Sequence, residues 1–179
     1  DISELRKAIN LTKRVMVELR KKGIKFDRNI EIGVMIEIPS AAVSSELMGG
    51  QVSFFSIGSN DLTQYTLAAD RDNQKLAGIF NPLHPAVLSL IRMTIESARK
   101  NKIPVAVCGE MSGDIMAIPL LIGMGINQLS MNPSKLPGAC QLISKIKYGD
   151  TIELAAEILQ MKTLKEIEEK LLEYNTSLE

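Results

Sequence analysis

Four side chains that suit catalysis or metal binding follow directly on apolar runs with the length of β-strands. They are Glu37, Asn60, Asp61 and Cys108. In α/β proteins the residues just past the carboxyl ends of parallel strands form the sites, because a rigid sheet holds exposed loops there. Two carboxylates, an amide and a thiol in these positions therefore predict a functional site at one edge of a parallel sheet.

The two carboxylates are separated by about one strand and one helix, so adjacent strands would bring Glu37 and Asp61 together. Mg²⁺ commonly takes one or two carboxylates together with substrate oxygens and water. The alternative is that Glu37 pairs with a lysine and that Asp61 caps a helical turn. Their spacing alone does not decide between a metal site and these structural roles.

Three further side chains have both a chemical and a structural interpretation. Cys108, immediately after a strand, suits proton transfer or nucleophilic attack, although free cysteines are also common as inert core residues. Asn60 can donate to an anionic oxygen or simply form a turn. Arg71 can form a fork to a carboxylate or phosphate, or it is a solvated surface arginine. Position, more than residue type, favours a functional role for Cys108.

The elements that would position these residues alternate between strand and helix. Apolar runs predict strands at 31–38, 52–57, 103–107 and 126–130. The first run carries few charges, as expected of a strand buried on both faces. Helices are predicted near the N-terminus, from Pro39, from Pro85, around 115–122, from Asn132 and twice in the tail. The stretch 58–82 shows no strong strand signal and is compatible with short helical turns.

Three pairs of residues match the capping box that begins many helices. The pairs are Asp1 with Glu4, Asp150 with Glu153, and Thr163 with Glu166.

The alternation of strands and helices amounts to four βα units. It predicts an α/β fold of about four parallel strands with flanking helices, equal to half of a (βα)8 barrel. A flavodoxin-like open sheet is the alternative, but no glycine-rich phosphate loop follows the first strand.

Composition limits the function classes. The 179 residues carry 21 basic and 21 acidic side chains, so no nucleic-acid or anionic-membrane partner is indicated. No apolar stretch reaches the roughly 20 residues of a membrane helix, and no signal-peptide pattern opens the chain. The two cysteines, Cys108 and Cys140, lie in dissimilar settings. We therefore expect a reducing, cytoplasmic location without membrane insertion.

Four segments, read together, resemble the phosphoenolpyruvate (PEP)-binding C-terminal domain of the PEP-utilising enzymes. They are Met-Ile-Glu-Ile-Pro-Ser at 35–40, Phe-Phe-Ser-Ile-Gly-Ser-Asn-Asp-Leu-Thr-Gln-Tyr-Thr at 54–66, Asp-Arg-Asp-Asn at 70–73 and Cys-Gly-Glu-Met-Ser-Gly at 108–113. The resemblance is greatest to the enzyme I branch of the phosphotransferase system. Pyruvate phosphate dikinase and PEP synthase share the motifs, so an enzyme of that type is an alternative.

The resemblance implies a (βα)8 barrel that binds Mg²⁺ and PEP and gives the phosphoryl group to a histidine of a separate domain. The phosphocarrier HPr then receives it, and pyruvate is released. The family's metal-binding acids correspond to Glu37 and Asp61. Its substrate-binding residues correspond to Asn60 and Arg71, and the cysteine that exchanges a proton with the enolpyruvate carbon corresponds to Cys108.

The chain also departs from the family pattern, since the phosphohistidine domain and the first half of the barrel are not in it. We expect residues 1–179 to be one domain fragment, with a half barrel over 30–147 and C-terminal helices over 150–177. Alone it should be inactive, and it should self-associate or pair its edges in a non-native way, because a half barrel leaves two strand edges unpaired. The resemblance to enzyme I separately implies a homodimer formed through this region. A metabolite-sensing or dimerisation module, or a lyase acting on pyruvate enolates, is the alternative.

Overall fold

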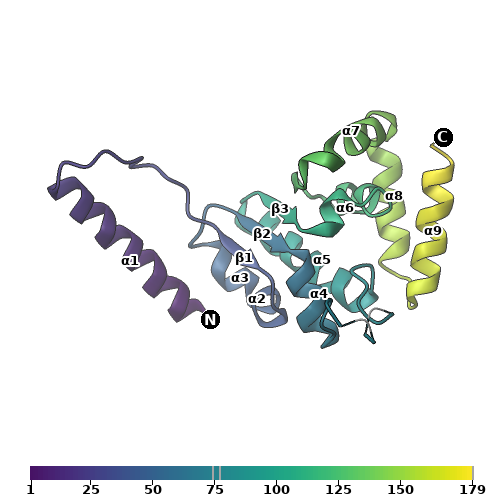
Figure 1. The fold of residues 1–179 in the computed structure, drawn as a ribbon, viewed down its shortest axis with the longest axis horizontal. Coiled ribbons are helices and arrows are strands. Elements are labelled where there is room, and N and C mark those ends of the chain that lie inside the picture. Colours follow the sequence, from purple (N-terminus) through teal and green to yellow (C-terminus); the bar gives the residue numbers. More distant parts are fainter. Residues whose placement is uncertain (74, 77, 179) are drawn as a thin grey trace.

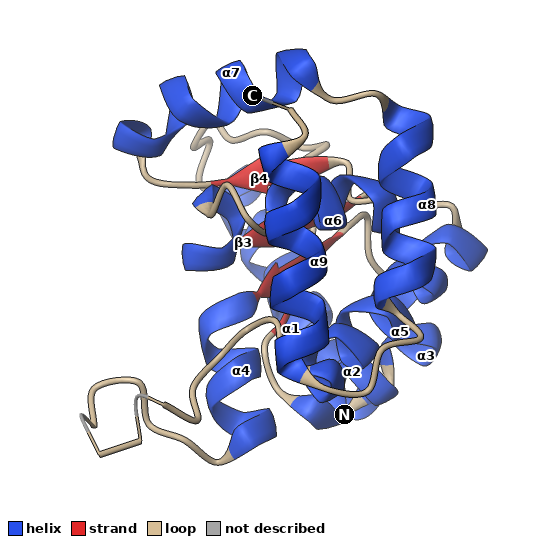
Figure 2. Ribbon diagram, turned by 90° about the vertical axis from the view of Figure 1, so that its right-hand side faces the viewer, coloured by secondary structure: helices blue, strands red, loops and turns tan. Residues whose placement is uncertain are grey.

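The fold is α/β, with four parallel strands and helices packed beside them, as the sequence predicts. The computed structural model describes residues 1–73, 75–76 and 78–178. The strands are β1 (Val34–Ile36), β2 (Phe55–Gly58), β3 (Val105–Cys108) and β4 (Gln128–Ser130), and they lie in the order β1-β2-β3-β4. Figure 1 shows β1, β2 and β3 side by side in this order, and Figure 2 shows β4 next to β3. This is the arrangement expected of half of a (βα)8 barrel.

The helices occupy the connections between strands and the two terminal regions. They are α1 (Ile2–Lys21), α2 (Pro39–Val43), α3 (Ser45–Gly49), α4 (Ser59–Leu67), α5 (Pro85–Asn101), α6 (Ile118–Met124), α7 (Leu136–Lys145), α8 (Tyr148–Ile158) and α9 (Leu164–Thr176), with short 3₁₀ turns at Glu110–Gly113 and Pro133–Lys135. Each crossover from one strand to the next contains a helix, which is what parallel pairing requires.

The sheet is buried on one face only. Ile36, Ile57 and Val107 lie level with one another in the sheet and are fully buried beneath the helices. Met35, which points to the other face, is 50% exposed. The prediction that the first strand is buried on both faces is therefore wrong, because the helices that cover this sheet pack against one side and leave the other uncovered.

Helix α5 is the largest contributor to the layer beneath the sheet. Its buried residues recur at helical spacing: Val87, Leu88, Ile91, Ile95 and Ala98. Pro85 lies in the first turn, as predicted, and the His84 side chain accepts a hydrogen bond from the backbone nitrogen of Ala86 at 3.1 Å. The lone histidine thus caps a helix, which satisfies one of the free N–H groups at the helix start.

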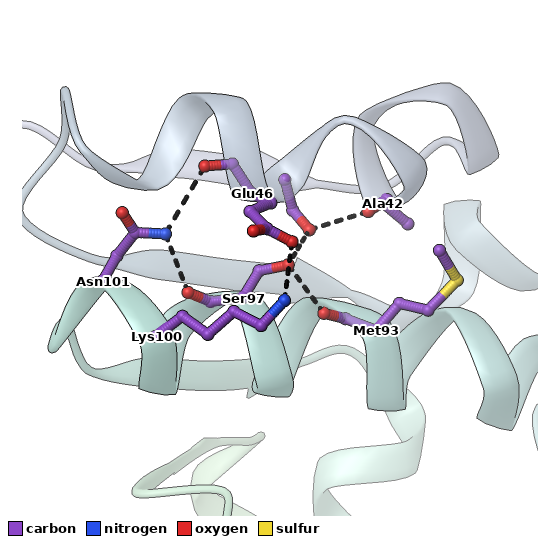
Figure 3. Close-up of polar contacts among 7 residues, drawn as sticks. Ala42, Glu46, Met93, Ser97, Lys100 and Asn101 are labelled. Carbon is purple, nitrogen blue, oxygen red and sulfur yellow. Dashed lines mark hydrogen bonds and ion pairs between the residues drawn. The ribbon is translucent and has the colours of Figure 1, made fainter.

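A small polar network fixes α3 to α5 (Figure 3). The buried hydroxyl of Ser45 lies 2.8 Å from that of Ser97. The Asn101 amide donates to the backbone oxygens of Ser97 and Glu46, and the Glu46 carboxylate pairs with Lys100 at 2.8 Å. Because the buried hydroxyls have partners, they do not incur the desolvation cost of unpaired polar groups. The network holds the chain segment that leads into β2.

Local signals located most helices but misjudged two of them. Within 58–82, where the sequence indicates at most short helical turns, the structure contains the longer helix α4, whose start has no side-chain cap. Helix α8 begins at Tyr148, so Asp150 lies in its first turn and the predicted cap with Glu153 is wrong. The capping boxes at Asp1 and Thr163 are confirmed.

Helix α1 extends away from the sheet (Figure 1). None of its residues is buried, and Arg6 near its start donates to the Gln51 side chain at 3.2 Å. Gly23 ends the helix with φ +68, as predicted. Among the described residues, no helix has both the length and the apolar character needed to cross a membrane.

Candidate active site

Parallel pairing brings the carboxyl ends of all four strands to one edge, and the predicted residues are distributed along it. Glu37 follows β1, Asn60 and Asp61 lie in the first turn of α4 directly after β2, and Cys108 ends β3. Gly58 and Cys108 are partners in the register of β2 and β3. Three neighbouring strands therefore deliver acid, amide and thiol groups to the same edge.

Glu37 lies against the end of β2, where the absence of a side chain leaves room for it. A Cβ on Gly58 would lie 2.9 Å from Cβ and 3.1 Å from Oε2 of Glu37. In the described part of the chain, the half-buried carboxylate has neither an ion-pair partner nor a hydrogen bond. The lysine pairing considered as an alternative for Glu37 is thus not formed, and both oxygens stay available to a ligand.

Asp61 is exposed, and its carboxylate makes no capping hydrogen bond to α4. No group of three or more His, Cys, Asp or Glu side chains close enough to hold a metal ion occurs among residues 1–73, 75–76 and 78–178. Mg²⁺ binds through one or two carboxylates while keeping waters or substrate oxygens.

Asn60 links the loop after β2 to the loop after β3. Its Oδ1 accepts a hydrogen bond from the backbone nitrogen of Glu110 at 3.0 Å, and Ser59 Oγ donates to the carbonyl of Cys108 at 2.8 Å. Because the backbone N–H occupies the amide oxygen, the amide nitrogen of Asn60 is the end left for a ligand. That end is a donor, which suits an anionic oxygen.

Gly109 permits this close approach of the two loops. Its φ of 98 and ψ of −167 belong to a region of backbone conformation that is essentially restricted to glycine. A Cβ there would lie 2.6 Å from Ser59 Oγ and 2.9 Å from Asn60 Oδ1. The glycine after Cys108 is thus required both by backbone conformation and by space.

Cys108 is half-buried and points to the uncovered face of the sheet. Its Sγ lies 3.4 Å from the carbonyl oxygen of Ile57, to which the thiol donates, and 3.8 Å from the Ser56 hydroxyl, which donates to the sulfur. Cys140 is exposed on α7, and both cysteines are free thiols. The sequence did not single out Ser56; its signal is a polar residue inside an apolar strand, on the same face as the thiol.

A cavity of about 1000 Å³ opens beside these loops. Asn60 and Cys108 both line it, together with Met111 and Met131 from the loops that follow β3 and β4. Charged groups at its wall include Glu110, Asp114 and Lys135. Asn60 and Cys108 therefore border one space that is large enough for a small substrate.

Arg71 is not brought to this cavity. It is exposed in the segment after α4, its backbone nitrogen lies 3.4 Å from Gln64 Oε1, and its Nε lies 3.9 Å from a carboxylate oxygen of Asp72. Glu37 and Asp61 lie at the same sheet edge but do not line the cavity either. The structure thus groups Asn60 with Cys108, places Glu37 over Gly58, and leaves Arg71 outside.

Comparison with known proteins gives a consistent result. The sequence model of the family described as "PEP-utilising enzyme, PEP-binding domain" matches residues 1–148. A protein of Haemophilus influenzae named phosphoenolpyruvate-protein phosphotransferase is 41% identical over 97% of this chain and 30% of its own length. Proteins of the same name from Mycoplasma capricolum and Bacillus subtilis are each 40% identical over 93% of this chain and 29% of their lengths. The chain thus spans about 30% of these relatives.

Proposed function

Because the chain belongs to the PEP-binding domain family of the PEP-utilising enzymes, we propose that it binds PEP and supports transfer of its phosphoryl group to a histidine of another domain. HPr would be the subsequent phosphocarrier, and pyruvate the released product. Relatives named phosphoenolpyruvate-protein phosphotransferase favour this reaction over that of a dikinase or a lyase. A cytoplasmic location is part of the same proposal.

The observation that carries the proposal is the cavity shared by Asn60 and Cys108. Phosphoryl transfer is mainly positioning and charge neutralisation, and the enolate left behind must then gain a proton. The amide nitrogen of Asn60 would donate to a phosphate oxygen. The thiol of Cys108 would protonate the enolate carbon as a general acid, which converts it to pyruvate.

Glu37 and Asp61 would hold Mg²⁺ between themselves and the substrate. When bound, the ion would offset negative charge on the substrate carboxylate, enolate and phosphate. The Glu37 carboxylate supports this because, among the residues that the structure describes, it has no hydrogen-bond or ion-pair partner and lies beside Gly58. Arg71 would contact the phosphate only if the segment after α4 moves toward the cavity, so its role as a substrate-binding residue requires a rearrangement.

The reaction and the metal requirement are tested in a chimera in which this chain replaces the homologous segment of the Haemophilus influenzae relative. We expect PEP to phosphorylate the acceptor histidine in a Mg²⁺-dependent manner. Glu37→Gln and Asp61→Asn should each raise the Mg²⁺ concentration needed by at least about tenfold, because each removes a charged ligand. The measurement is the initial rate of phosphohistidine formation against Mg²⁺ concentration.

The matched control is Glu153→Gln, which removes an exposed acid on α8 and should not change the Mg²⁺ requirement. A chimera that is folded by circular dichroism yet never accepts the phosphoryl group would refute the proposed function.

Titration of the isolated chain with PEP and Mg²⁺ addresses the alternative of a metabolite sensor. We expect no tight binding there, and submicromolar binding would favour the sensor.

Self-association of the isolated chain is a second expected result. β1 and β4 are the edge strands of the sheet, so no strand among the described residues pairs with their outer backbone groups, and Met35 is half exposed on the uncovered face. Such edges pair with other chains unless they are covered. We expect sedimentation velocity to give a dimer or larger species, and a compact monomer at micromolar concentration would contradict a homodimer formed in this way.

A further inference from the structure

A second cavity, of about 690 Å³, lies at the opposite end of β3 from Cys108. Helices α5, α6 and α8 form its walls, and Val105 and Asn127 line it where β3 and β4 begin. None of the described residues lines both this cavity and the one that Asn60 and Cys108 border. Its volume is in the usual range for a small-molecule site. The cavity is therefore a separate candidate binding site, at the amino ends of the strands.

One wall of this cavity is positively charged. Three of the described residues that line it are cationic, namely Arg92, Arg99 and Lys102, and Glu96 is the one acid among them. Arg92 and Arg99 are seven positions apart on α5, so they lie about two turns apart on the same helix face. Arg92 pairs with Glu96 at 3.8 Å, whereas Arg99 and Lys102 form no ion pair with any residue that the structure describes. Two cations are thus available to an anion.

The opposite wall is mostly apolar. Tyr148, Ile152 and Leu159 of α8 line it, and Tyr148 is 61% and Ile152 45% exposed. Asn127 adds a neutral donor to the lining: its Oδ1 accepts a hydrogen bond from the backbone nitrogen of Val105 at 3.3 Å, so its amide nitrogen is the end left for a ligand. An apolar surface and a few polar donors are the usual lining of a small-molecule site.

We propose that this cavity binds a small organic phosphate with an apolar or aromatic body, the chemical class to which nucleotides belong. Arg99 and Lys102 would hold the phosphate oxygens, because a guanidinium forms paired hydrogen bonds to phosphate and an ammonium adds charge. Two cations three positions apart match the double charge of a phosphate better than the single charge of a carboxylate. The ring would cover Tyr148 and Ile152 and so remove exposed apolar surface from water.

The backbone of Lys102 is an independent observation in favour of this site. Lys102 ends α5 with φ 56 and ψ 39, which is the left-handed region that residues with a side chain seldom adopt. Glycine is the usual residue at such a helix end, because it has no Cβ and adopts this conformation without steric cost. A lysine therefore makes the helix end less stable than a glycine would. An ammonium group that binds an anion gives a reason for the lysine.

The experiment titrates the intact, ¹⁵N-labelled chain with 1-naphthyl phosphate and follows the backbone amides by NMR. We expect saturable shifts within 92–105, 123–127 and 148–159, with half-saturation at or below about 0.3 mM, an ordinary affinity for a ligand of this size. Inorganic phosphate and uncharged 1-naphthol should each bind at least about tenfold more weakly, because each supplies only one of the two kinds of contact.

Variants of α5 separate a specific site from general attraction between charges. Arg99→Gln and Lys102→Asn should each weaken binding of the probe about fivefold to tenfold, as for loss of one hydrogen bond to a charged group. Asparagine is chosen because it tolerates the left-handed conformation. The matched control is Lys100→Gln in the same turn, since Lys100 pairs with Glu46 at 2.8 Å and does not line the cavity. It should stay within about twofold of the parent chain.

Lys102→Gly tests the binding role against a purely structural one. Because glycine relieves the backbone at this position, the midpoint of urea unfolding should shift upward. Binding of 1-naphthyl phosphate should nevertheless fall about fivefold to tenfold, as in Lys102→Asn. A more stable chain that binds the probe more weakly excludes damage to the fold as the cause. Unchanged binding in Lys102→Gly would show that the lysine only ends the helix, and would overturn the inference.

Three further results would overturn it. They are the absence of saturable shifts at the amides named, shifts confined to the surroundings of Asn60 and Cys108, and equal binding of 1-naphthol and 1-naphthyl phosphate. An equal loss of binding in Lys100→Gln and Arg99→Gln would likewise reduce the effect to general electrostatics. Neither PEP nor Mg²⁺ is present in these titrations, so the outcome does not depend on the proposed function, which the chimera tests with this cavity unchanged.

Discussion

Replacement of Cys108 by alanine is expected to separate proton transfer from phosphoryl transfer. The phosphoryl group moves between oxygen and nitrogen and needs no proton from the thiol, whereas conversion of the enolate to pyruvate does. General acid–base catalysis typically contributes about 10²- to 10⁴-fold. In the chimera, Cys108→Ala should therefore slow enzyme-dependent deuterium exchange into the pyruvate methyl group by about that factor.

The companion measurement is phosphohistidine formation in a single turnover, which should be reduced far less. Cys140→Ala is the control, because that thiol is exposed on α7 and Cys140 is not among the residues that line the cavity. Equal loss of phosphorylation and of deuterium exchange would contradict the role assigned to Cys108. It would indicate instead that the thiol is needed for the structure of the cavity.

Gly123→Ala should strongly destabilise the fold, although alanine is the better helix former. Gly123 lies in α6, and a Cβ there would come within 3 Å of Thr151 and Ala155 in α8, with the closest approach to the Thr151 backbone carbonyl. Backbone atoms cannot rotate aside, so α6 and α8 must separate. We expect the free energy of unfolding to fall by about 2 kcal/mol, because an overpacking cost of about 3 kcal/mol outweighs a gain of about 1 kcal/mol in helix propensity.

The matched control is Gly149→Ala on α8, where an added Cβ meets no atom within 4 Å. With no steric cost, this change should leave the free energy of unfolding unchanged or raise it by up to about 1 kcal/mol. Urea unfolding followed by circular dichroism measures both variants. If Gly123→Ala is as stable as the parent chain, the close packing of α6 on α8 is incorrect.

Sequence patterns identified the sheet because strand and helix signals are mostly local. The apolar runs before Glu37, Asp61 and Cys108 and the helix from Pro85 follow from residue type and spacing. In place of helix α4 the sequence indicated only short helical turns, because the start of the helix, Gly58, offers no side-chain cap. The Asp150 cap failed because the chain enters the helix at Tyr148, before that aspartate.

The roles of the site residues were assigned from ordered motifs in the sequence. The contacts that these residues make in the structure could not be deduced from those motifs. That Asn60 holds the backbone of Glu110, and that Gly109 must lack a Cβ because Ser59 passes beside it, are contacts between residues about fifty positions apart. Such contacts depend on how two strands are aligned, which no local pattern encodes. The position of Arg71 outside the cavity was likewise not visible in its motif.

By itself, the sequence determined that this chain forms parallel βα units and that acids, an amide and a thiol end their strands at a common edge. Only the tertiary structure decided which face of the sheet is uncovered, that Ser56 lies against Cys108, and that Gly58 makes room for Glu37. The physical reason is that hydrophobic periodicity specifies which side of each element is buried, whereas strand register specifies which side chains meet.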